Sequence, residues 1–233
     1  MKNIALIIAG GSGVRMGSNI PKQFIAVNGK PILAYTLDSF EKFPLVDEII
    51  VVCVEGWEGK VWEYKEKYGI TKLSFIVRGG NTCQESIRNG VFYLEGKVDD
   101  DDNVIIHDGI RPLVQDDVLY DLIEKCDKYG NAVTSMPYNE QIFLMDDDIS
   151  TISYIPRDTL RRVATPQCYK FNLLDEKYHE AYSKKVGIYG SSYTNTMMVE
   201  LGVRLYFAKG SDRNIKLTTP GDLEIFRAMI KKE

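Results

Sequence analysis

Short, continuous apolar runs alternate with segments of helical periodicity along most of this chain. The runs have the length of strands, and those at 4–9 and 103–107 suit strands that are buried on both faces. They cover residues 4–9, 48–54, 73–77, 103–107 and 132–136. Helical patterns lie between them at 31–43, 58–68, 82–94 and 116–130. This alternation predicts a Rossmann-like α/β fold, in which helices cover both faces of a mostly parallel sheet.

The pattern changes between residues 137 and 164. Apolar and polar residues alternate there on both sides of a DDD turn at 146–148, which predicts a hairpin that protrudes as a β-arm. An excursion of this length is often functional or a dimer contact. Beyond it we expect helices near 172–184 and 193–201, a strand at 203–208 and a helix after Pro220. The 233 residues are therefore assigned to a single domain, 1–233, with an arm at about 137–164.

Composition narrows the classes of partner and compartment. The formal net charge of −4 does not favour a nucleic-acid partner, although a local basic pocket can still hold a small anion. The four cysteines and two histidines do not have the spacing of a zinc site. Because no apolar stretch has the length of a signal peptide or a membrane span, we expect a cytoplasmic protein with free thiols and no membrane partner.

A glycine loop directly after the first apolar run carries the strongest chemical signal. Its backbone N–H groups, in the segment AGGSG at 9–13, can cradle phosphate oxygens. The loop is neither a GxGxxG fingerprint, since Met16 stands at the third glycine, nor a Walker A loop. Arg15 and Lys22 lie on the same loop, and two cations there suit a triphosphate and its departing pyrophosphate. Each feature alone also fits an ordinary turn with surface cations.

The loop segment AGGSGVRMGSNIPKQF at 9–24 resembles the signature of the polyol-phosphate cytidylyltransferases, which act on 2-C-methyl-D-erythritol 4-phosphate or ribitol 5-phosphate. Four further segments match this family in order: RGGNTCQESIRNG at 78–90, HDGIRP at 107–112, ATPQ at 164–167 and NIKLTTPGDL at 214–223. The resemblance implies a GT-A-like nucleotidyltransferase fold, transfer of a cytidylyl group from CTP, and Mg²⁺ as cofactor. It also implies a homodimer in which each arm reaches into the neighbouring subunit.

The resemblance assigns roles to individual positions. The implied catalytic residues are Arg15, Lys22 and Lys216. The implied CTP-binding residues are Ala9, Gly10, Gly11, Gly13, Gly80, Asn81, Ser86 and Gly109. The implied acceptor-binding residues are Asp108, Arg111, Arg157 and Thr165, with Asp108 also the metal ligand. A carboxylate at the end of a buried strand suits a hard cation, with a turn or helix cap as the alternative for Asp108. For Ser86, a helix cap is as good an interpretation as a contact with cytidine. We expect His107 to be packed or hydrogen-bonded rather than a general base.

Two positions depart from the family pattern. Cys83 stands where the family usually has Arg, and Asn195 where it usually has Asp. Arg88, a turn later, is a candidate substitute for the missing arginine. These departures leave three alternatives open: an altered acceptor, weakened activity, and a non-catalytic dimeric relative. A sugar-phosphate nucleotidyltransferase of the same fold that uses another nucleotide is a separate alternative. The failed GxGxxG pattern disfavours an NAD-dependent oxidoreductase.

Overall fold

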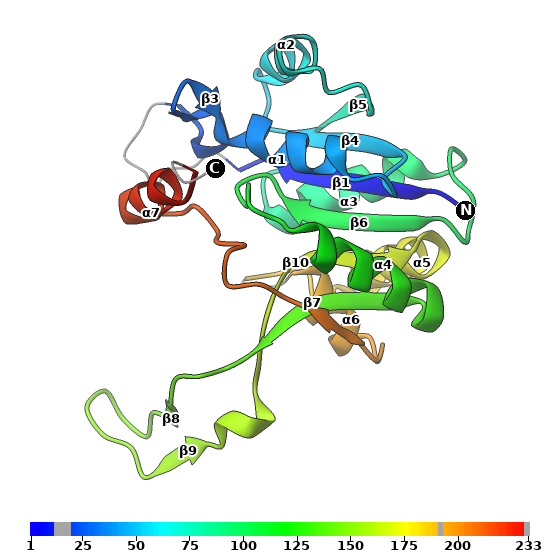
Figure 1. The fold of residues 1–233 in the computed structure, drawn as a ribbon. Helices are drawn as coiled ribbons and strands as arrows, with labels where there is room; N and C mark the ends of the chain where they lie inside the picture. The colour runs from blue at the N-terminus through cyan, green and yellow to red at the C-terminus, as the bar shows by residue number, and fades with distance from the viewer. Residues whose placement is uncertain (12–19, 191–192, 231–233) are drawn as a thin grey trace.

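The computed structural model describes residues 1–11, 20–190 and 193–230. Its centre is a seven-stranded sheet in the order β11-β7-β10-β6-β1-β4-β5 (Figure 1). Neighbouring strands pair in parallel except at β10, which is antiparallel to both β6 and β7. The strands are β1 Asn3–Ala9, β4 Glu48–Cys53, β5 Leu73–Arg78, β6 Asn103–Asp108, β7 Asn131–Pro137, β10 Arg161–Lys170 and β11 Phe207–Lys209. The predicted α/β fold with a mostly parallel sheet is confirmed.

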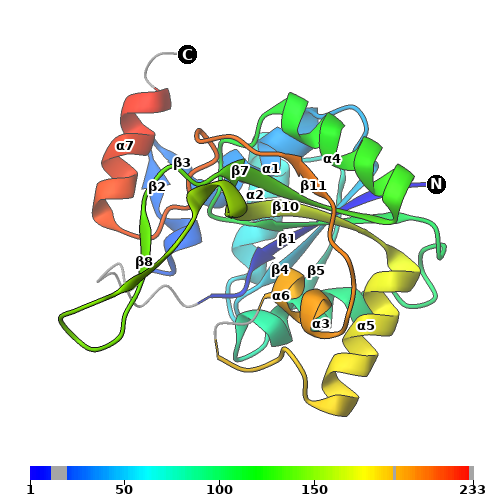
Figure 2. The ribbon, with the colours of Figure 1, turned by 90° about the horizontal axis from the view of Figure 1, so that it is seen from below.

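Side chains of the central strand β1 separate into two cores by the alternation of a strand. Ala5 and Ile7 point into the core beneath α1 (Ile32–Lys42), α2 (Glu58–Tyr68) and α4 (Asp116–Tyr129). Ile4 and Leu6 point into the core beneath α3 (Cys83–Leu94), α5 (Phe171–Lys184) and α6 (Thr194–Glu200). Figure 2 shows these two helical layers on opposite faces of the sheet. Burial on both faces explains why the strand sequence is continuously apolar.

A third, smaller core lies beside the main sheet. The C-terminal helix α7 (Pro220–Ile230) packs there through Phe226 against Ile32 and against Val27 of the small β2–β3 hairpin (Ala26–Val27 and Lys30–Pro31). Leu217 of the preceding segment joins this core, and its backbone N–H donates to Ile110 O at 3.0 Å. The chain near Lys216 is therefore held against the end of β6.

Two strand predictions need correction. The sequence analysis did not predict β10, because ATPQ interrupts its apolar residues and leaves no continuous run. The strand expected at 203–208 is instead β11, Phe207–Lys209. The Asn131 side chain explains this shift: its amide donates to Arg204 O at 3.0 Å and accepts from the Tyr206 N–H at 3.3 Å. It thereby occupies backbone groups that a longer strand would need.

The arm leaves the sheet after β7 and returns into β10 (Figure 1). It contains the antiparallel pair β8 (Ile142–Leu144) and β9 (Ser153–Ile155), so the predicted hairpin is confirmed. Its apolar side chains face outward, and Ile149 and Ile152 are each 96% exposed. Among the described residues, no helix has the length and apolar character needed to cross a membrane.

Candidate active site

Two adjoining pockets open at the carboxyl ends of β1 and β6. The parallel register places Ile8 beside Asp108, and the Gly109 N–H donates to Ile8 O at 2.8 Å. The glycine loop and the HDGIRP segment therefore leave the sheet side by side, where open α/β sheets bind ligands. One pocket, of about 250 Å³, lies over the glycine loop, and the other, of about 330 Å³, lies towards β10. Both are lined by Ile8, Cys83, Asp108, Tyr193 and Lys216.

The first pocket, here called the nucleotide pocket, is lined by backbone that packs closely on the start of α3. A Cβ added at Gly10 would lie 2.6 Å from Ser86 Oγ. That hydroxyl accepts from the Gly80 N–H at 3.0 Å and donates to Thr82 O at 2.9 Å. Thr82 in turn caps α3 by accepting from the Glu85 N–H. Gly10 is therefore required by a close approach of loop and helix, which leaves the loop backbone exposed to the pocket.

Gln23 holds the glycine loop in place through hydrogen bonds, a role that the sequence analysis did not identify. Its side chain is only 1% exposed, and its amide donates to Ala9 O at 2.7 Å and to Gly11 O at 2.9 Å. Two backbone carbonyls of the loop are therefore turned towards Gln23. The position of this glutamine, directly after Lys22 in the signature segment, was the available signal.

Asp108 is the electrostatic centre of the second pocket, here called the acceptor pocket. Its Oδ2 lies 2.9 Å from Arg111 Nε and 3.1 Å from Lys216 Nζ, and its backbone N–H donates to Thr165 Oγ1 at 3.1 Å. Burial alone would raise the pKa of Asp108, but the charges of Lys216 and Arg111 outweigh it and lower the pKa to about 2. The carboxylate is therefore ionised at neutral pH and holds two cations in place.

Buried hydrogen bonds hold Arg111 and Thr165 in position beside Asp108. Asn214 accepts from Arg111 Nη1 through its backbone carbonyl at 2.8 Å, and its side-chain amide donates to Thr165 O at 2.7 Å. Behind it, His107 Nε2 lies 2.9 Å from Arg111 O, so the ring carries its proton there and donates it. Burial lowers the pKa of His107 to about 4. A neutral imidazole with no exposed surface positions the turn, in agreement with the role expected from the sequence.

Most of the predicted site residues come together in these pockets. Ala9, Gly10, Gly11, Lys22, Asn81 and Ser86 line the nucleotide pocket. Asp108, Arg111, Thr165 and Lys216 line the acceptor pocket. Arg15 and Gly13 lie outside the described residues.

Four other residues lie elsewhere. Gly80 and Gly109 line neither pocket; added Cβ atoms would lie 2.3 Å from Glu85 Cβ and 3.1 Å from Ile8 O, respectively, so both glycines serve close packing. Arg157 sits on the arm beside Tyr154 and Ile155, in a separate hollow. Arg88 contacts the Tyr182 ring, 4.5 Å from its centroid, and lines neither pocket. It therefore does not take the place of the arginine missing at Cys83.

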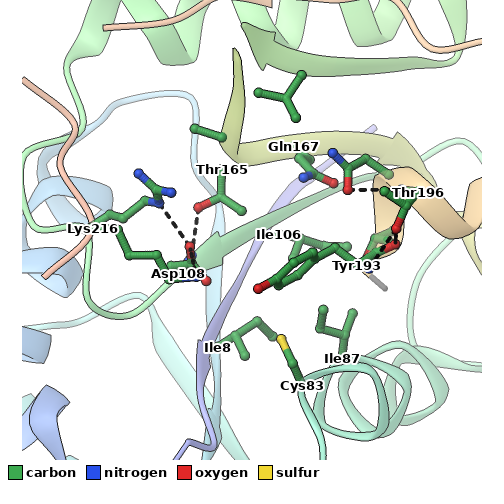
Figure 3. A pocket seen from close by; sticks show the side chains of 15 residues that line it. Ile8, Cys83, Ile87, Ile106, Asp108, Thr165, Gln167, Tyr193, Thr196 and Lys216 are labelled. Atoms are coloured by element: carbon green, nitrogen blue, oxygen red, sulfur yellow. Dashed lines mark hydrogen bonds and ion pairs between the residues drawn. The ribbon is translucent and has the colours of Figure 1, made fainter. Parts of the chain in front are cut away.

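Tyr193 is a further pocket residue that the sequence analysis did not identify. Figure 3 shows its ring extending across the pocket towards Asp108, above Ile8 and Cys83. Lys216 Nζ lies 5.6 Å from the centroid of this ring, a distance at which a cation and an aromatic face attract each other. A tyrosine before a short helix carries no motif, so only the fold reveals this contact.

Comparison with known proteins identifies the family to which the chain belongs. The family model of 2-C-methyl-D-erythritol 4-phosphate cytidylyltransferase (IspD) matches residues 3–232. A ribitol-5-phosphate cytidylyltransferase of Lacticaseibacillus paracasei is 54% identical, over 98% of each chain. A 2-C-methyl-D-erythritol 4-phosphate cytidylyltransferase of Clostridium acetobutylicum is 38% identical, over 99% of this chain and 98% of the relative. The crystal structure of the Francisella tularensis 2-C-methyl-D-erythritol 4-phosphate cytidylyltransferase is 27% identical, with a TM-score of 0.79 and coverage of 98% of this chain and 99% of that one. The chain therefore belongs to the IspD family of cytidylyltransferases.

Proposed function

We propose that this enzyme transfers the cytidylyl group of CTP to ribitol 5-phosphate and releases pyrophosphate. The main observation behind this proposal is the wall that the two pockets share. Asp108 and Lys216 lie on this wall, between the nucleotide pocket and the acceptor pocket, which is also lined by Arg111. The ribitol-5-phosphate cytidylyltransferase, at 54% identity, favours ribitol 5-phosphate as acceptor. The methylerythritol enzyme, at 38%, makes 2-C-methyl-D-erythritol 4-phosphate the second candidate.

The chemistry needs positioned charge rather than a nucleophilic side chain. A phosphate oxygen of the acceptor attacks the α-phosphorus of CTP, the new P–O bond forms, and the bond to the β-phosphate oxygen breaks so that pyrophosphate leaves. The acceptor phosphate is already anionic at neutral pH, so no base is needed to remove a proton. Lys22 in the nucleotide pocket and Lys216 on the shared wall would neutralise the charge that develops on the triphosphate.

Arg111 and Thr165 would hold the acceptor phosphate within reach of this centre. Arg111 is already oriented by Asp108 and by Asn214 O, so little freedom is lost when the anion binds. The negative charge of Asp108 offsets the repulsion between Arg111 and Lys216 before the substrates bind. The site is therefore organised for two mutually repelling anions.

We also propose that Asp108 would hold Mg²⁺. Its Oδ2 is used by Arg111 and Lys216, and its Oδ1 has no partner among the described residues. One carboxylate oxygen together with substrate phosphates is a common way to bind Mg²⁺, which keeps several waters. The bound ion would draw negative charge from the triphosphate.

A homodimer with exchanged arms is the assembly we propose. Arg157 lies on the arm, away from the acceptor pocket of its own chain, and the arm exposes Phe143, Ile149, Ile152 and Tyr154. Exposed apolar side chains of this kind mark an interaction surface. An arm seated on the partner would bury them and bring Arg157 to the partner's acceptor phosphate.

The cytoplasm is the compartment we propose for this enzyme. The free cysteines fit that compartment, where thiols stay reduced.

Pyrophosphate release with CTP and Mg²⁺ tests this proposal. The acceptors are ribitol 5-phosphate, 2-C-methyl-D-erythritol 4-phosphate and glycerol 3-phosphate, with UTP replacing CTP as the nucleotide control. We expect turnover with CTP and the highest kcat/KM with ribitol 5-phosphate. Turnover that prefers the methylerythritol phosphate would reassign the acceptor, and CTP binding without turnover would favour the non-catalytic alternative that Cys83 suggested.

A further inference from the structure

The acceptor pocket has two chemically different ends. In Figure 3, Asp108, Thr165 and Lys216 lie at one end, and Gln167 and Thr196 lie at the other. Apolar side chains of Ile8, Ile87 and Ile106 form the floor between the two ends. Of the described residues that line this pocket, the charged ones, Asp108, Arg111 and Lys216, are at the first end, whereas the second end presents neutral amides and hydroxyls.

Two amides define the neutral end. Gln167 lies on β10, two residues from Thr165; it lines the same pocket and is 5% exposed. Asn195 lies in the first turn of α6 and is 8% exposed. The start of α6 is anchored from behind, because Thr194 Oγ1 lies 2.8 Å from the hydroxyl of the buried Tyr178. The pocket wall that carries Asn195 is therefore fixed by packing.

In both amides, the oxygen is already used within the fold. Asn195 Oδ1 accepts from the Thr196 N–H at 3.0 Å. Gln167 Oε1 accepts from the hydroxyl of Tyr169 at 2.9 Å; complete burial raises the pKa of that phenol well above its usual value, so it keeps its proton. Neither NH₂ group has a hydrogen-bond partner among the described residues. Each amide therefore has an unpartnered NH₂ donor group at the pocket, whereas its oxygen already accepts one hydrogen bond.

We propose that Gln167 and Asn195 are specificity-determining residues that donate hydrogen bonds to the hydroxyl oxygens of the acceptor farthest from its phosphate. This inference rests on the proposed function, because the phosphate must lie at the charged end beside the shared wall for its oxygen to reach the nucleotide. The rest of the acceptor then extends over the apolar floor towards the amides. An uncharged chain of carbinols suits this slot: its C–H groups contact the isoleucines and its last hydroxyls reach the donors.

The neutral residue at 195 also removes a charge from the pocket. A carboxylate there could not donate to a hydroxyl oxygen, and it would add a second anion to a pocket that must bind a phosphate. A donor that is buried and left without its hydroxyl partner disfavours shorter acceptors, because the cost of desolvating the amide is then not recovered. The two amides thus select for acceptor length.

Asn195→Leu tests the inference, because leucine has nearly the same size and no polar atom. Asn172→Leu is the matched control: Asn172 occupies the same position in the first turn of α5, its Oδ1 accepts from the next N–H at 2.6 Å, and its side chain is exposed outside both pockets. Both variants lose the same local hydrogen bond. The measurements are kcat/KM for ribitol 5-phosphate, the KM or inhibition constant of glycerol 3-phosphate, and the KM for CTP.

We expect Asn195→Leu to lower kcat/KM for ribitol 5-phosphate by about tenfold or more. The constant for glycerol 3-phosphate, which lacks the distal hydroxyls, and the KM for CTP should change less than about threefold, and Asn172→Leu should match the wild type. Gln167→Glu keeps an oxygen for Tyr169 but lacks the NH₂ group and adds a charge. It should therefore lower kcat/KM for ribitol 5-phosphate more than it weakens the binding of glycerol 3-phosphate.

Equal losses with both acceptors would show a structural effect and overturn the inference, as would full activity of Asn195→Leu with ribitol 5-phosphate. Full activity of Asn195→Asp would overturn the assignment of the amide as donor. A wild-type enzyme that turns over neither phosphate would instead refute the proposed function, on which the inference depends.

Discussion

Substitution of His107 by glutamine should change how the stability of this enzyme depends on pH. His107 is fully buried, its ring centroid lies 5.0 Å from that of the tilted Phe40 ring, and its Nε2 donates to Arg111 O at 2.9 Å. Its Nδ1 is buried and has no hydrogen-bond partner in the described part of the chain. A glutamine can keep the hydrogen bond to Arg111 but cannot take up a proton in this pH range. The variant therefore isolates the titration from the contact.

The sign and size of the effect follow from the lowered pKa. The native pKa is about 4, against 6.5 for an ordinary histidine. Above pH 6.5 neither state binds the proton, so His107 has no effect there. As the pH falls from 6.5 to 4, the unfolded chain binds a proton that the native state does not, and the native state loses stability. The loss amounts to about 1 kcal/mol at pH 5.5 and about 3 kcal/mol at pH 4.

Urea unfolding at pH 7, 5.5 and 4 measures this difference. The variant will have its own offset at pH 7 from altered packing against Phe40, so the informative quantity is the loss of unfolding free energy relative to pH 7. We expect the wild type to lose about 1 kcal/mol more than His107→Gln at pH 5.5 and about 3 kcal/mol more at pH 4. Parallel pH profiles for the two proteins would refute the reasoning, because they would mean that His107 takes up its proton equally well in the native state.

Three further predictions concern the pockets. Asp108→Asn should lower kcat/KM at least about 100-fold, because two cations lose their ion-pair partner and the proposed metal loses its ligand. In the wild type, the pH–rate profile should show no acidic limb from Asp108 above about pH 4, since the pKa of this carboxyl is about 2. Lys216→Met should lower kcat by about 100-fold or more with a smaller change in the KM for CTP, measured in the pyrophosphate assay. Gly10→Ala should lower the free energy of unfolding by about 1–3 kcal/mol, because the new Cβ lies 2.6 Å from Ser86 Oγ; Gly11→Ala, whose Cβ meets nothing within 4 Å, is the stability control and should match the wild type.

The strands that the sequence predicted well are those that need no partner to be recognised. β1, β4 and β6 are apolar on both faces because helices cover both sides of the sheet, and the pattern survives in the sequence alone. β10 was missed because its existence depends on two neighbours: it pairs with β6 through Gln167–Lys170 and with β7 through Arg161–Ala164 and Gln167–Tyr169. Backbone pairing of that kind leaves no periodic signature.

In the site, too, residues that belong to a local sequence motif were predicted, and residues that act through distant contacts were not. Asp108 and Lys22 were predictable because they stand in motifs that follow strands or glycine loops, where charged side chains serve chemistry. Gln23 and Asn214 were not identified, since their importance lies in hydrogen bonds to backbone carbonyls of segments distant in the sequence: Asn214 reaches Thr165, 49 residues away. The positions of Arg15 and Gly13 stay predictions, because both lie outside the described residues.

Asn195 shows most clearly what the sequence could and could not provide. The family comparison of motifs identified it as a position that lacks the usual carboxylate, and this suggested weakened or altered activity. An asparagine offers both a donor and an acceptor, so its identity alone does not say which of them a ligand meets. In the fold, the oxygen already accepts from the Thr196 N–H, whereas the NH₂ group has no partner among the described residues. Under the proposed role of Asn195, the departure from the family pattern changes which acceptor is selected. The ion pairs of Asp108 with Arg111 and Lys216 remain at the other end of the same pocket.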